Sequence, residues 1–251
     1  MWNTTSFDVR DRYPNLAPSS IVYDPMSLTY TLSEAYKDGK RWYAYDNELY
    51  PSITTLLTET DTEGQRALTK WRTAIGHEAA QRVTTSAATN GTRWHNFCEQ
   101  YVTGVPLQKF STLLHAPTDL QYAGALTHVL NTHVRRVFAS ELRVMSTEYG
   151  IAGRMDIGAE LMDGRYAIID FKTGKKPKTG NRLTNYACQA TFYADALTEQ
   201  LSSGRIDTIV IVQLCPTTIL WQESAPSYWR EELRSRIVQF ADIVNSRLDL
   251  L

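Results

Sequence analysis

A hairpin signal in the middle of the chain constrains where two of its strands lie. Asp163-Gly164 is a dipeptide typical of tight hairpin turns, and it separates two apolar-rich segments, 151–160 and 166–172. The segments are therefore predicted to pair in antiparallel fashion. A turn centred on Asp163 would place Asp156 opposite Asp170, whereas a turn centred between Asp163 and Gly164 would offset the two by one residue, which a bulge could correct.

The alternation of side chains along a strand assigns these residues to faces. Successive side chains point to opposite faces, so Asp170 and Lys172 should share one face and Phe171 should point to the other. By the same rule one buried face of the first segment should hold Ile151, Gly153, Met155, Ile157 and Ala159. Asp156 would then emerge on the face of Asp170 and Lys172. Taken alone, an Asp-x-Lys pair would usually be an exposed charged pair at the end of an edge strand.

Two carboxylates side by side on rigid strands repel one another unless a cation lies between them. Ligands that are all oxygens favour Mg²⁺ or Mn²⁺ over zinc. Such an ion would polarise a phosphodiester and lower the pKa of a bound water, and an ammonium would orient this nucleophile or offset charge on the phosphorane. The pattern of Asp156, Asp170 and Lys172 therefore indicates a metal-dependent phosphodiesterase site.

Two segments that follow the second strand extend this pattern. The segment 173–182 carries four basic residues and no acid, so it could hold phosphates, although a hydrated loop is an alternative reading. These basic residues are Lys175, Lys176, Lys178 and Arg182. A helix predicted over about 186–199 would place Gln189 and Tyr193 on one face. Both could assist at the site, or Tyr193 could pack in the core while Gln189 caps a backbone group.

A helical histidine supplies another candidate ligand. His95 and Glu99 are four residues apart in a helix predicted from Thr92 to Tyr101, and a neutral imidazole there could bind a metal ion. A lone helical histidine is more often structural. The neighbouring elements are expected to be helices over about 63–88, with a break near Gly76, and over 119–140.

The remaining elements complete an α+β or α/β-like pattern with a mixed sheet. Residues 1–20 are predicted to form a partly irregular arm, and residues 21–50 one or two hairpins. Further strands are expected near 142–148, 208–214 and 218–222, and a last helix over about 227–248.

The order of these motifs resembles the PD-(D/E)XK nucleases of the RecB type, and most closely the branch of the mitochondrial genome maintenance exonuclease and related tailed-phage exonucleases. That family has a helical histidine, a Gly-x-x-Asp strand, an Asp/Glu-x-Lys strand and a Gln-x-x-x-Tyr helix. The matching positions are His95, 153–156, 170–172 and 189–193, and an early Pro-Ser-x-Thr-Thr segment matches 51–55. The resemblance covers roughly residues 40 to 220.

The resemblance implies a fold and a set of site residues. The fold is a restriction-endonuclease-like core, a mixed central sheet flanked by helices. Metal ligands would be His95, Asp156, Asp170 and the Phe171 carbonyl, and catalytic residues would be Asp156, Asp170, Lys172, Gln189 and Tyr193. Glu141 is a further acidic candidate, with Glu148 and Glu99 as competitors.

The resemblance also implies an activity. It is that of a Mg²⁺- or Mn²⁺-dependent DNA exonuclease acting on single-stranded or end-processed DNA in replication, recombination or repair, with a replication or recombination protein as a candidate partner. A structure-specific flap endonuclease on the same fold is one alternative. A catalytically silent DNA-binding protein is another, although the intact set of Asp156, Asp170 and Lys172 speaks against it.

Composition narrows these expectations. A chain of 251 residues that is 43% hydrophobic can bury a full core, and residues 1–251 are expected to form one nuclease domain with an N-terminal arm and hairpin over about 1–50. The net charge is only −1, so DNA contact must come from local patches such as the 173–182 loop and Lys70, Arg72 and Arg93.

Cysteines and apolar runs exclude other classes of protein. Cys98, Cys188 and Cys215 lack metal-ligand spacing, so neither a disulfide framework nor an iron-sulfur cluster is expected. The longest apolar stretches are strand-sized, and the first residues have no signal run. The sequence therefore predicts a cytoplasmic protein with no membrane contact.

Overall fold

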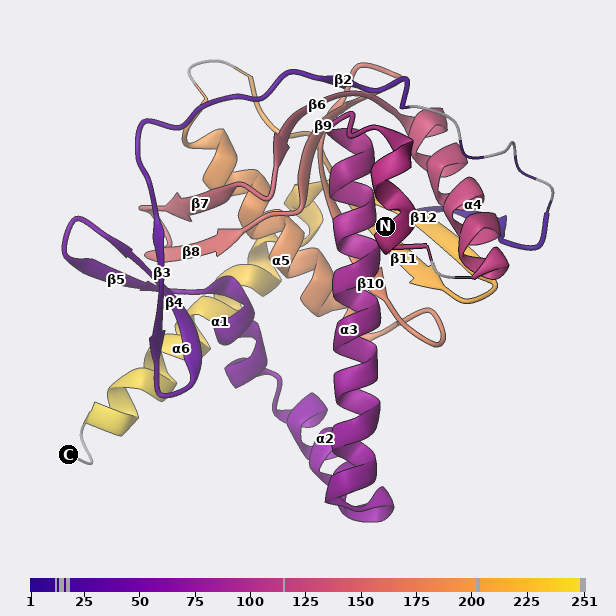
Figure 1. Cartoon of the computed structure of the whole chain (residues 1–251). Helices are drawn as coiled ribbons and strands as arrows, with labels where there is room; N and C mark the ends of the chain where they lie inside the picture. The colour runs from indigo at the N-terminus through magenta and orange to yellow at the C-terminus, as the bar shows by residue number, and fades with distance from the viewer. Residues whose placement is uncertain (12, 14–15, 17–18, 115, 202–203, 249–251) are drawn as a thin grey trace.

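A seven-stranded mixed sheet forms the middle of the molecule, and helices cover both of its faces (Figure 1). The structure is a computed structural model that describes residues 1–248 apart from 12, 14–15, 17–18, 115 and 202–203. Across the sheet the strands are, in order, β1 (Asn3–Asp8), β12 (Thr218–Ser224), β11 (Thr208–Cys215), β10 (Tyr166–Thr173), β9 (Ile157–Leu161), β6 (Val134–Ser140) and β2 (Val22–Tyr23). The pairs β10–β11 and β2–β6 are parallel, and the other neighbours are antiparallel.

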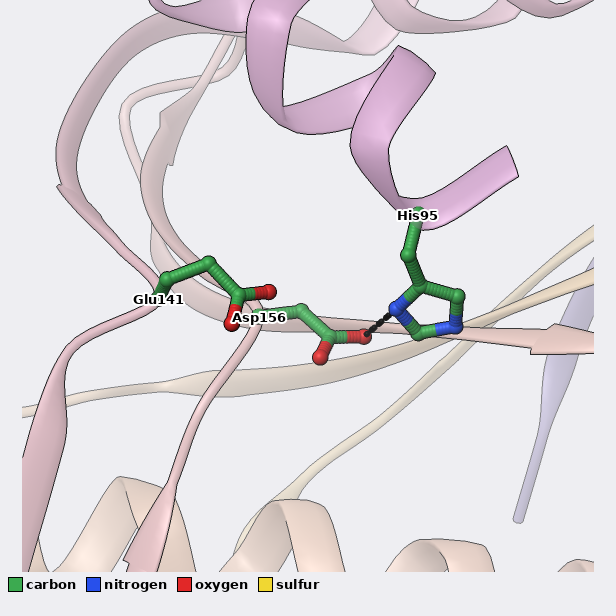
Figure 2. A group of neighbouring side chains, drawn as sticks. All are labelled: His95, Glu141 and Asp156. Carbon is green, nitrogen blue, oxygen red and sulfur yellow. Dashed lines mark ion pairs between the residues drawn. The ribbon is translucent and has the colours of Figure 1, made fainter. Parts of the chain in front are cut away.

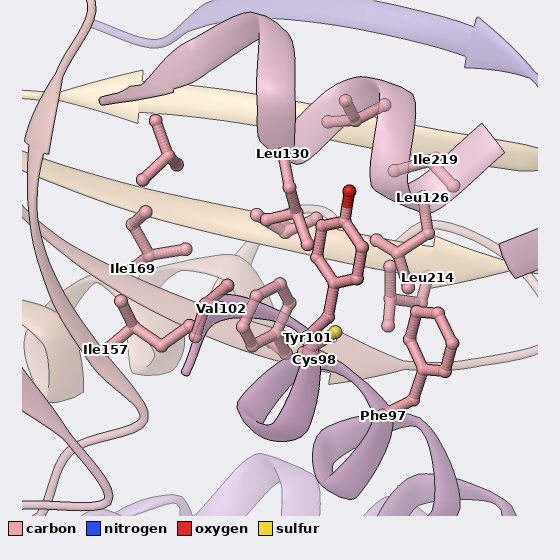
Figure 3. Close-up of a cluster of buried hydrophobic side chains, with 14 of the residues drawn as sticks. Phe97, Cys98, Tyr101, Val102, Leu126, Leu130, Ile157, Ile169, Leu214 and Ile219 are labelled. Carbon is pink, nitrogen blue, oxygen red and sulfur yellow. The ribbon is translucent and has the colours of Figure 1, made fainter. Parts of the chain in front are cut away.

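Two hydrophobic cores lie on the two faces of this sheet. The first contains α3 (His77–Val102) and α4 (Pro117–His133), and the second contains α1 (Ile53–Thr60), α5 (Asn181–Thr198) and α6 (Arg230–Leu248). Figure 3 shows part of the first core, which contains Phe97 of α3, Leu126 of α4 and the strand residues Ile157 and Ile169. Strand β11 is buried throughout because its alternate side chains enter the two cores. The sheet is therefore the middle layer of three.

Smaller elements stand beside the main sheet. They are the three-stranded sheet of β3 (Ser33–Lys37), β4 (Lys40–Tyr45) and β5 (Glu48–Pro51), the pair β7 (Arg143–Ser146) and β8 (Ile151–Arg154), helix α2 (Thr62–Ile75), and the short 3₁₀ helices η1 (Leu107–Thr112) and η2 (Pro226–Tyr228). Helix α2 has no buried residue, and together with the first half of α3 it projects from the body of the protein (Figure 1). The α+β class with a mixed sheet flanked by helices is thus confirmed.

The segment that resembles Pro-Ser-x-Thr-Thr forms the start of α1. The Ser52 Oγ accepts a hydrogen bond of 3.0 Å from the Thr55 N–H, which caps the helix. Ser52 also forms a β-bridge with Ala152 of β8. This segment therefore fixes α1 against the strand that leads to Asp156.

The register of the central hairpin is the one that a turn centred on Asp163 predicts. Tyr166 pairs with Glu160 and Ile169 with Ile157, so the pairing stops one residue before Asp156 would face Asp170. The hairpins expected over 21–50 are also present, with turns at Asp38-Gly39 and Asp46-Asn47 that adopt positive φ angles.

The prediction of a single strand over residues 151–160 is wrong. The segment is two strands, because β8 pairs with β7 whereas β9 pairs with β6 and β10. The change of partner at Met155 and Asp156 turns the chain, so that Ile151 and Met155 pack in the second core and Ile157 packs in the first. The buried face that the alternation predicted does not exist as one face.

Four other boundaries differ from the sequence prediction. Residues 134–140 form β6 instead of the end of a helix, because strand β9 offers this segment, which includes Val134, Val137 and Phe138, a ladder. Helix α3 continues without the break expected near 88–92, since Gly91 packs inside it close to the end of β10. Helix α5 begins at Asn181, which places Arg182 on the helix and not in the loop. Residues 3–8 of the expected irregular arm form β1; part of that arm lies outside the described residues.

Gly153 allows β8 to touch helix α5 directly. A Cβ atom at this position would lie 2.6 Å from Cε1 of Tyr193 and 3.1 Å from Cγ2 of Ile53, closer than van der Waals contact permits. Both of these neighbours are fully or almost fully buried and cannot move aside cheaply. The first position of the Gly-x-x-Asp segment is therefore required by packing.

We expect Gly153→Ala to destabilise the fold by about 1–3 kcal/mol, because the added methyl group displaces the Tyr193 ring. Urea unfolding monitored by circular dichroism measures the change. The same substitution in a Tyr193→Leu background should cost less, since the shorter side chain vacates the contested space. Equal costs in both backgrounds would show that the contact does not limit this position.

Candidate active site

The side chains of β10 divide between the two faces of the sheet. Asp170 and Lys172 lie on one face, where the Lys172 Nζ is 2.6 Å from the Asp170 Oδ2, while Phe171 enters the first core. The Asp170 side chain is 1% exposed, and that of Lys172 is 19% exposed. The shared face predicted from alternation is confirmed, and the pair is buried at the middle of the sheet where an edge strand was the alternative.

Asp156 occupies the point where β8 ends and β9 begins. Its Oδ2 accepts a hydrogen bond of 2.8 Å from the Phe171 N–H and lies 3.4 Å from the Nδ1 of His95 on α3 (Figure 2). The side chain thus pairs with the backbone of β10 just beyond the last residue pair of the ladder, Ile157 and Ile169. This bond holds the Asp156 carboxylate beside β10 at the level of Asp170.

Three side chains could hold a metal ion. His95, Glu141 and Asp156 each offer a ligand atom, and these atoms all lie within 4.8 Å of one another (Figure 2). Glu141 joins β6 to β7 with a φ of 50°, and its N–H donates to the Asp156 carbonyl at 2.8 Å. A non-glycine residue in this left-handed conformation is strained, and such strain concentrates at functional sites.

The other acidic candidates lie elsewhere. Asp170 does not belong to the group of three, although its Oδ1 is buried and has no hydrogen-bond partner among the described residues. Glu148 is exposed and lies 3.7 Å from Arg234. Glu99 contributes to raising the pKa of Glu141 and is half-buried on α3. Of the three glutamates, Glu141 alone joins His95 and Asp156.

Helix α5 positions the ammonium of Lys172. The Lys172 Nζ donates to the Gln189 Oε1 at 3.0 Å, and the Gln189 Nε2 donates to the Tyr193 hydroxyl at 3.1 Å. The ring centroid of Tyr186 lies 5.1 Å from the same Nζ, a contact that the sequence reasoning missed. Its spacing of three residues from Gln189 was the available signal. Tyr193 is 1% exposed, so it acts on Lys172 through Gln189.

The basic residues after β10 do not form one patch. Lys175 lines a hollow of about 590 Å³ between α3, α4 and the ends of β10 and β11, whereas Arg182 lines a hollow of about 350 Å³ beside α1 and α2. Lys178 is fixed to β11, because its N–H donates to the Gln213 Oε1 at 2.6 Å. Lys176 is exposed. Lys175 and Arg182 therefore lie on different sides of β10.

Burial and charge set unequal protonation at the two aspartates. Burial raises the pKa of Asp170 to about 6, with the charge of Asp156 adding to the rise and Lys172 opposing it. Burial also raises the pKa of Asp156, but the His95 imidazole and Lys172 outweigh it and the net pKa is below the ordinary value. Burial lowers the pKa of Lys172, and the two carboxylates more than reverse this. The site therefore holds an ammonium next to a carboxylate that lacks a second cation.

We expect the stability of the metal-free protein to fall as pH rises from about 4 to about 6. Folded Asp170 keeps its proton in this window whereas unfolded Asp170, with an ordinary value of 3.8, does not, so the folded state binds more protons. At about 1.4 kcal/mol per pKa unit, the loss is about 3 kcal/mol. Urea unfolding in EDTA against pH measures it, with Asp170→Asn as the reference. Parallel curves for the two proteins would contradict this assignment.

The three cysteines are buried with free thiols, and among the described residues no helix is long and apolar enough to cross a membrane.

The sequence profile of the PD-(D/E)XK nuclease superfamily matches residues 56–241, well over half of the chain. A search of curated proteins finds no match. Nucleases of this superfamily use divalent metals, which agrees with the His95, Glu141 and Asp156 group. The matched region contains β6 to β12 and every residue of the site just described, and the chain therefore belongs to the PD-(D/E)XK nuclease superfamily.

Proposed function

We propose that this protein is a DNA exonuclease that hydrolyses phosphodiester bonds with Mg²⁺ or Mn²⁺ and acts on single-stranded or end-processed DNA in replication, recombination or repair. The observation that carries the proposal is the buried Asp170, which lies beside Asp156 with one oxygen unpaired and the Lys172 ammonium on the other. The exonuclease assignment rests on the resemblance to the mitochondrial genome maintenance and tailed-phage branch. A replication or recombination protein is a candidate partner.

The residues of the site suit a divalent ion. The unpaired Oδ1 of Asp170 and the neighbouring Asp156 carboxylate would hold it, with His95, Glu141 and the Phe171 carbonyl as further ligands. Carboxylate oxygens suit Mg²⁺ and Mn²⁺, and the imidazole nitrogen is tolerated better by Mn²⁺. When bound, the ion would polarise the scissile phosphate and supply a water of lowered pKa.

Lys172 would stabilise the charge that develops on the phosphate. Its pKa lies above the ordinary value, so the ammonium is fully charged at neutral pH. Asp170 and Gln189 hold the Nζ at 2.6 Å and 3.0 Å, and Tyr193 fixes the amide of Gln189 in turn. A cation held in place before the reaction needs no reorganisation when charge appears. Gln189 and Tyr193 are thus proposed as positioning residues for this lysine.

The charge distribution supports a nucleic acid as substrate. Residues 62–89, the helical hairpin of α2 and the first half of α3, contain four basic and two acidic residues and have a net charge of +2. The whole chain has 26 basic and 27 acidic residues, so the rest has 22 and 25 and a net charge of −3. The exposed Lys70 and Arg72 lie on this hairpin. A basic projection on an acidic body favours contact with phosphates.

Two alternatives to an exonuclease make different predictions. A flap endonuclease on the same fold would need no DNA end, and a silent DNA-binding protein would need no catalytic lysine. The ion pair of Lys172 with Asp170 and its bond to Gln189 favour an enzyme, because burying a charged pair at the site costs desolvation energy that a binding surface does not require.

We expect the protein to degrade linear single-stranded DNA with Mg²⁺ or Mn²⁺, to spare closed circles, and to be inactive in EDTA. Lys172→Ala should lower kcat by about 10²–10³, the usual loss for one group that stabilises transition-state charge. End-labelled linear, duplex and circular DNA resolved on gels measure both effects. Cleavage of circles would favour the endonuclease, and binding without cleavage of any substrate would favour the silent protein.

We expect Glu141→Gln to weaken the binding of Mn²⁺, because it removes one charged oxygen from the group with His95 and Asp156. Isothermal titration calorimetry with Mn²⁺ measures the affinity. Glu148→Gln is the matched control, since this exposed glutamate loses the same charge far from the group. Asp156→Asn should have the largest effect. Equal affinities for the two glutamine variants would remove Glu141 from the metal site.

A further inference from the structure

Helix α1 separates two hollows next to the candidate active site. The first has a volume of about 350 Å³ and is lined by Arg182, Tyr186 and Gln189 of α5. The second has a volume of about 360 Å³ and is lined by residues of the β3–β4 hairpin, among them Tyr36 and Arg41.

Both hollows border the same two threonines. Thr54 and Thr58 of α1 line the first hollow and the second, so the two meet across the outer side of this helix. The path begins at Gln189, which binds the Lys172 ammonium. We call this path, from Gln189 across Thr54 and Thr58 to Arg41, the α1 groove.

Each hollow contains a buried polar atom without a hydrogen-bond partner in the described part of the chain. In the second hollow it is the Nε of Arg41, whose Nη2 donates to the Thr54 Oγ1 at 3.1 Å. In the first it is the Oδ1 of Asn185, whose Nδ2 donates to the Asp61 Oδ2 at 3.0 Å. A buried donor or acceptor left unpaired costs about 1–3 kcal/mol, so an ordered water or a small shift of the side chain toward a ligand is expected to satisfy these atoms.

Cations and tyrosines occur together in both hollows. Arg182 accompanies Tyr186 in the first, and Lys40 and Arg41 accompany Tyr36 in the second. Tyr36 is 70% exposed, so the face of its ring is open to a ligand.

The acidic residues of the groove are already engaged. The Asp61 Oδ1 accepts from the Gly64 N–H at 2.9 Å and caps α2, and Glu59 lies 3.0 Å from Lys40. The groove is lined by three basic and two acidic residues, so it offers a net charge of +1 together with hydroxyl groups and aromatic faces.

We infer that the α1 groove binds a single strand of nucleic acid next to the scissile bond, with Arg41 on a phosphate and Tyr36 stacked on a base. Proteins that hold single strands combine a basic groove that follows the backbone with aromatic rings on which the bases stack. A duplex keeps its bases stacked on one another and offers no free face to Tyr36. The inference rests on the proposed nuclease function, because the groove begins at Gln189, which binds the lysine assigned to cleavage.

The experiment is fluorescence anisotropy with a labelled oligothymidylate of about 20 nucleotides, in EDTA so that no cleavage occurs. Tyr36→Ala should weaken binding by at least about fivefold, because one base loses its stacking partner. Tyr36→Phe keeps the ring and should bind as the wild type does. Tyr228→Ala is the matched control, since Tyr228 is 66% exposed and lines neither hollow.

Arg41→Ala tests the phosphate contact by its salt dependence. Losing one contact should make the slope of log K against log salt shallower by about 0.7, the value expected for one phosphate of a single strand. Arg205→Ala removes an exposed cation that lines neither hollow and should leave the slope unchanged. Because Tyr36 is exposed, its truncation does not disturb the core even if Arg41→Ala perturbs the Thr54 contact.

The outcomes separate this inference from the nuclease function. Wild-type affinity and slope in both Tyr36→Ala and Arg41→Ala would overturn the groove, and cleavage by the wild type would leave the nuclease function intact. A wild type that binds the oligonucleotide through Tyr36 but cleaves no DNA would support the groove and refute the nuclease. Failure of the wild type to bind any single strand would overturn the groove.

Discussion

The hydrogen bond from the Phe171 N–H to the Asp156 carboxylate is the contact on which the site depends. The antiparallel ladder of β9 and β10 ends at Ile157 and Ile169, and the next bond across the hairpin is made by a side chain in place of a backbone carbonyl. The backbone at Asp156 is thereby released to bond Glu141, and β8 leaves the main sheet to pair with β7. A strand that continued along β10 would point Asp156 according to the pleat, away from His95 and Glu141.

The departure of β8 also brings this strand against α5 in the second core. Gly153 of β8 meets Tyr193 of α5, and Tyr193 fixes Gln189, which in turn holds Lys172. The packing of Gly153 in β8 therefore affects, through α5, the position of the Lys172 ammonium on β10. The Gly-x-x-Asp spacing follows from this geometry: the glycine fits against α5 and the aspartate, three residues on, turns toward α3. The Gly-x-x-Asp segment therefore contacts α5 through its glycine and α3 through its aspartate.

The sequence predicted the fold and the relative positions of candidate site residues correctly where local sequence patterns determine the structure. Asp163-Gly164 predicted the hairpin and left two registers, one of which the structure has, alternation placed Asp170 and Lys172 on one face, and helical spacing joined Gln189 to Tyr193. Local rules failed where partners far along the chain decide. Residues 134–140 became a strand because β9 was available, and α3 ran through Gly91 because β10 lies against it.

The site shows the same division between local and distant determinants. Glu141 could be named only as one of three acidic candidates, because its approach to His95 depends on a left-handed backbone and on the break at Asp156, neither of which leaves a periodic signal. The contact of Tyr186 with Lys172 was similarly hidden, since it requires both the start of α5 and the side of β10 that α5 covers. The residue types predicted the chemistry of the site, whereas the topology was needed to show which residues belong to it.

Helix α5 links the chemistry to the surface beside it. Its first turns carry Arg182 and Tyr186 along the α1 groove, its middle carries Gln189 beside Lys172, and Tyr193 anchors it in the second core. Since a helix is rigid over this length, a ligand that rests on its first turns is held in a fixed position relative to the Lys172 ammonium. Under the proposed function, Asp170 on β10 and Asp156 between β8 and β9 would fix the other side of the reaction centre independently. Substrate position and catalytic charge would then be set by separate elements, which meet at the bond between Gln189 and Lys172.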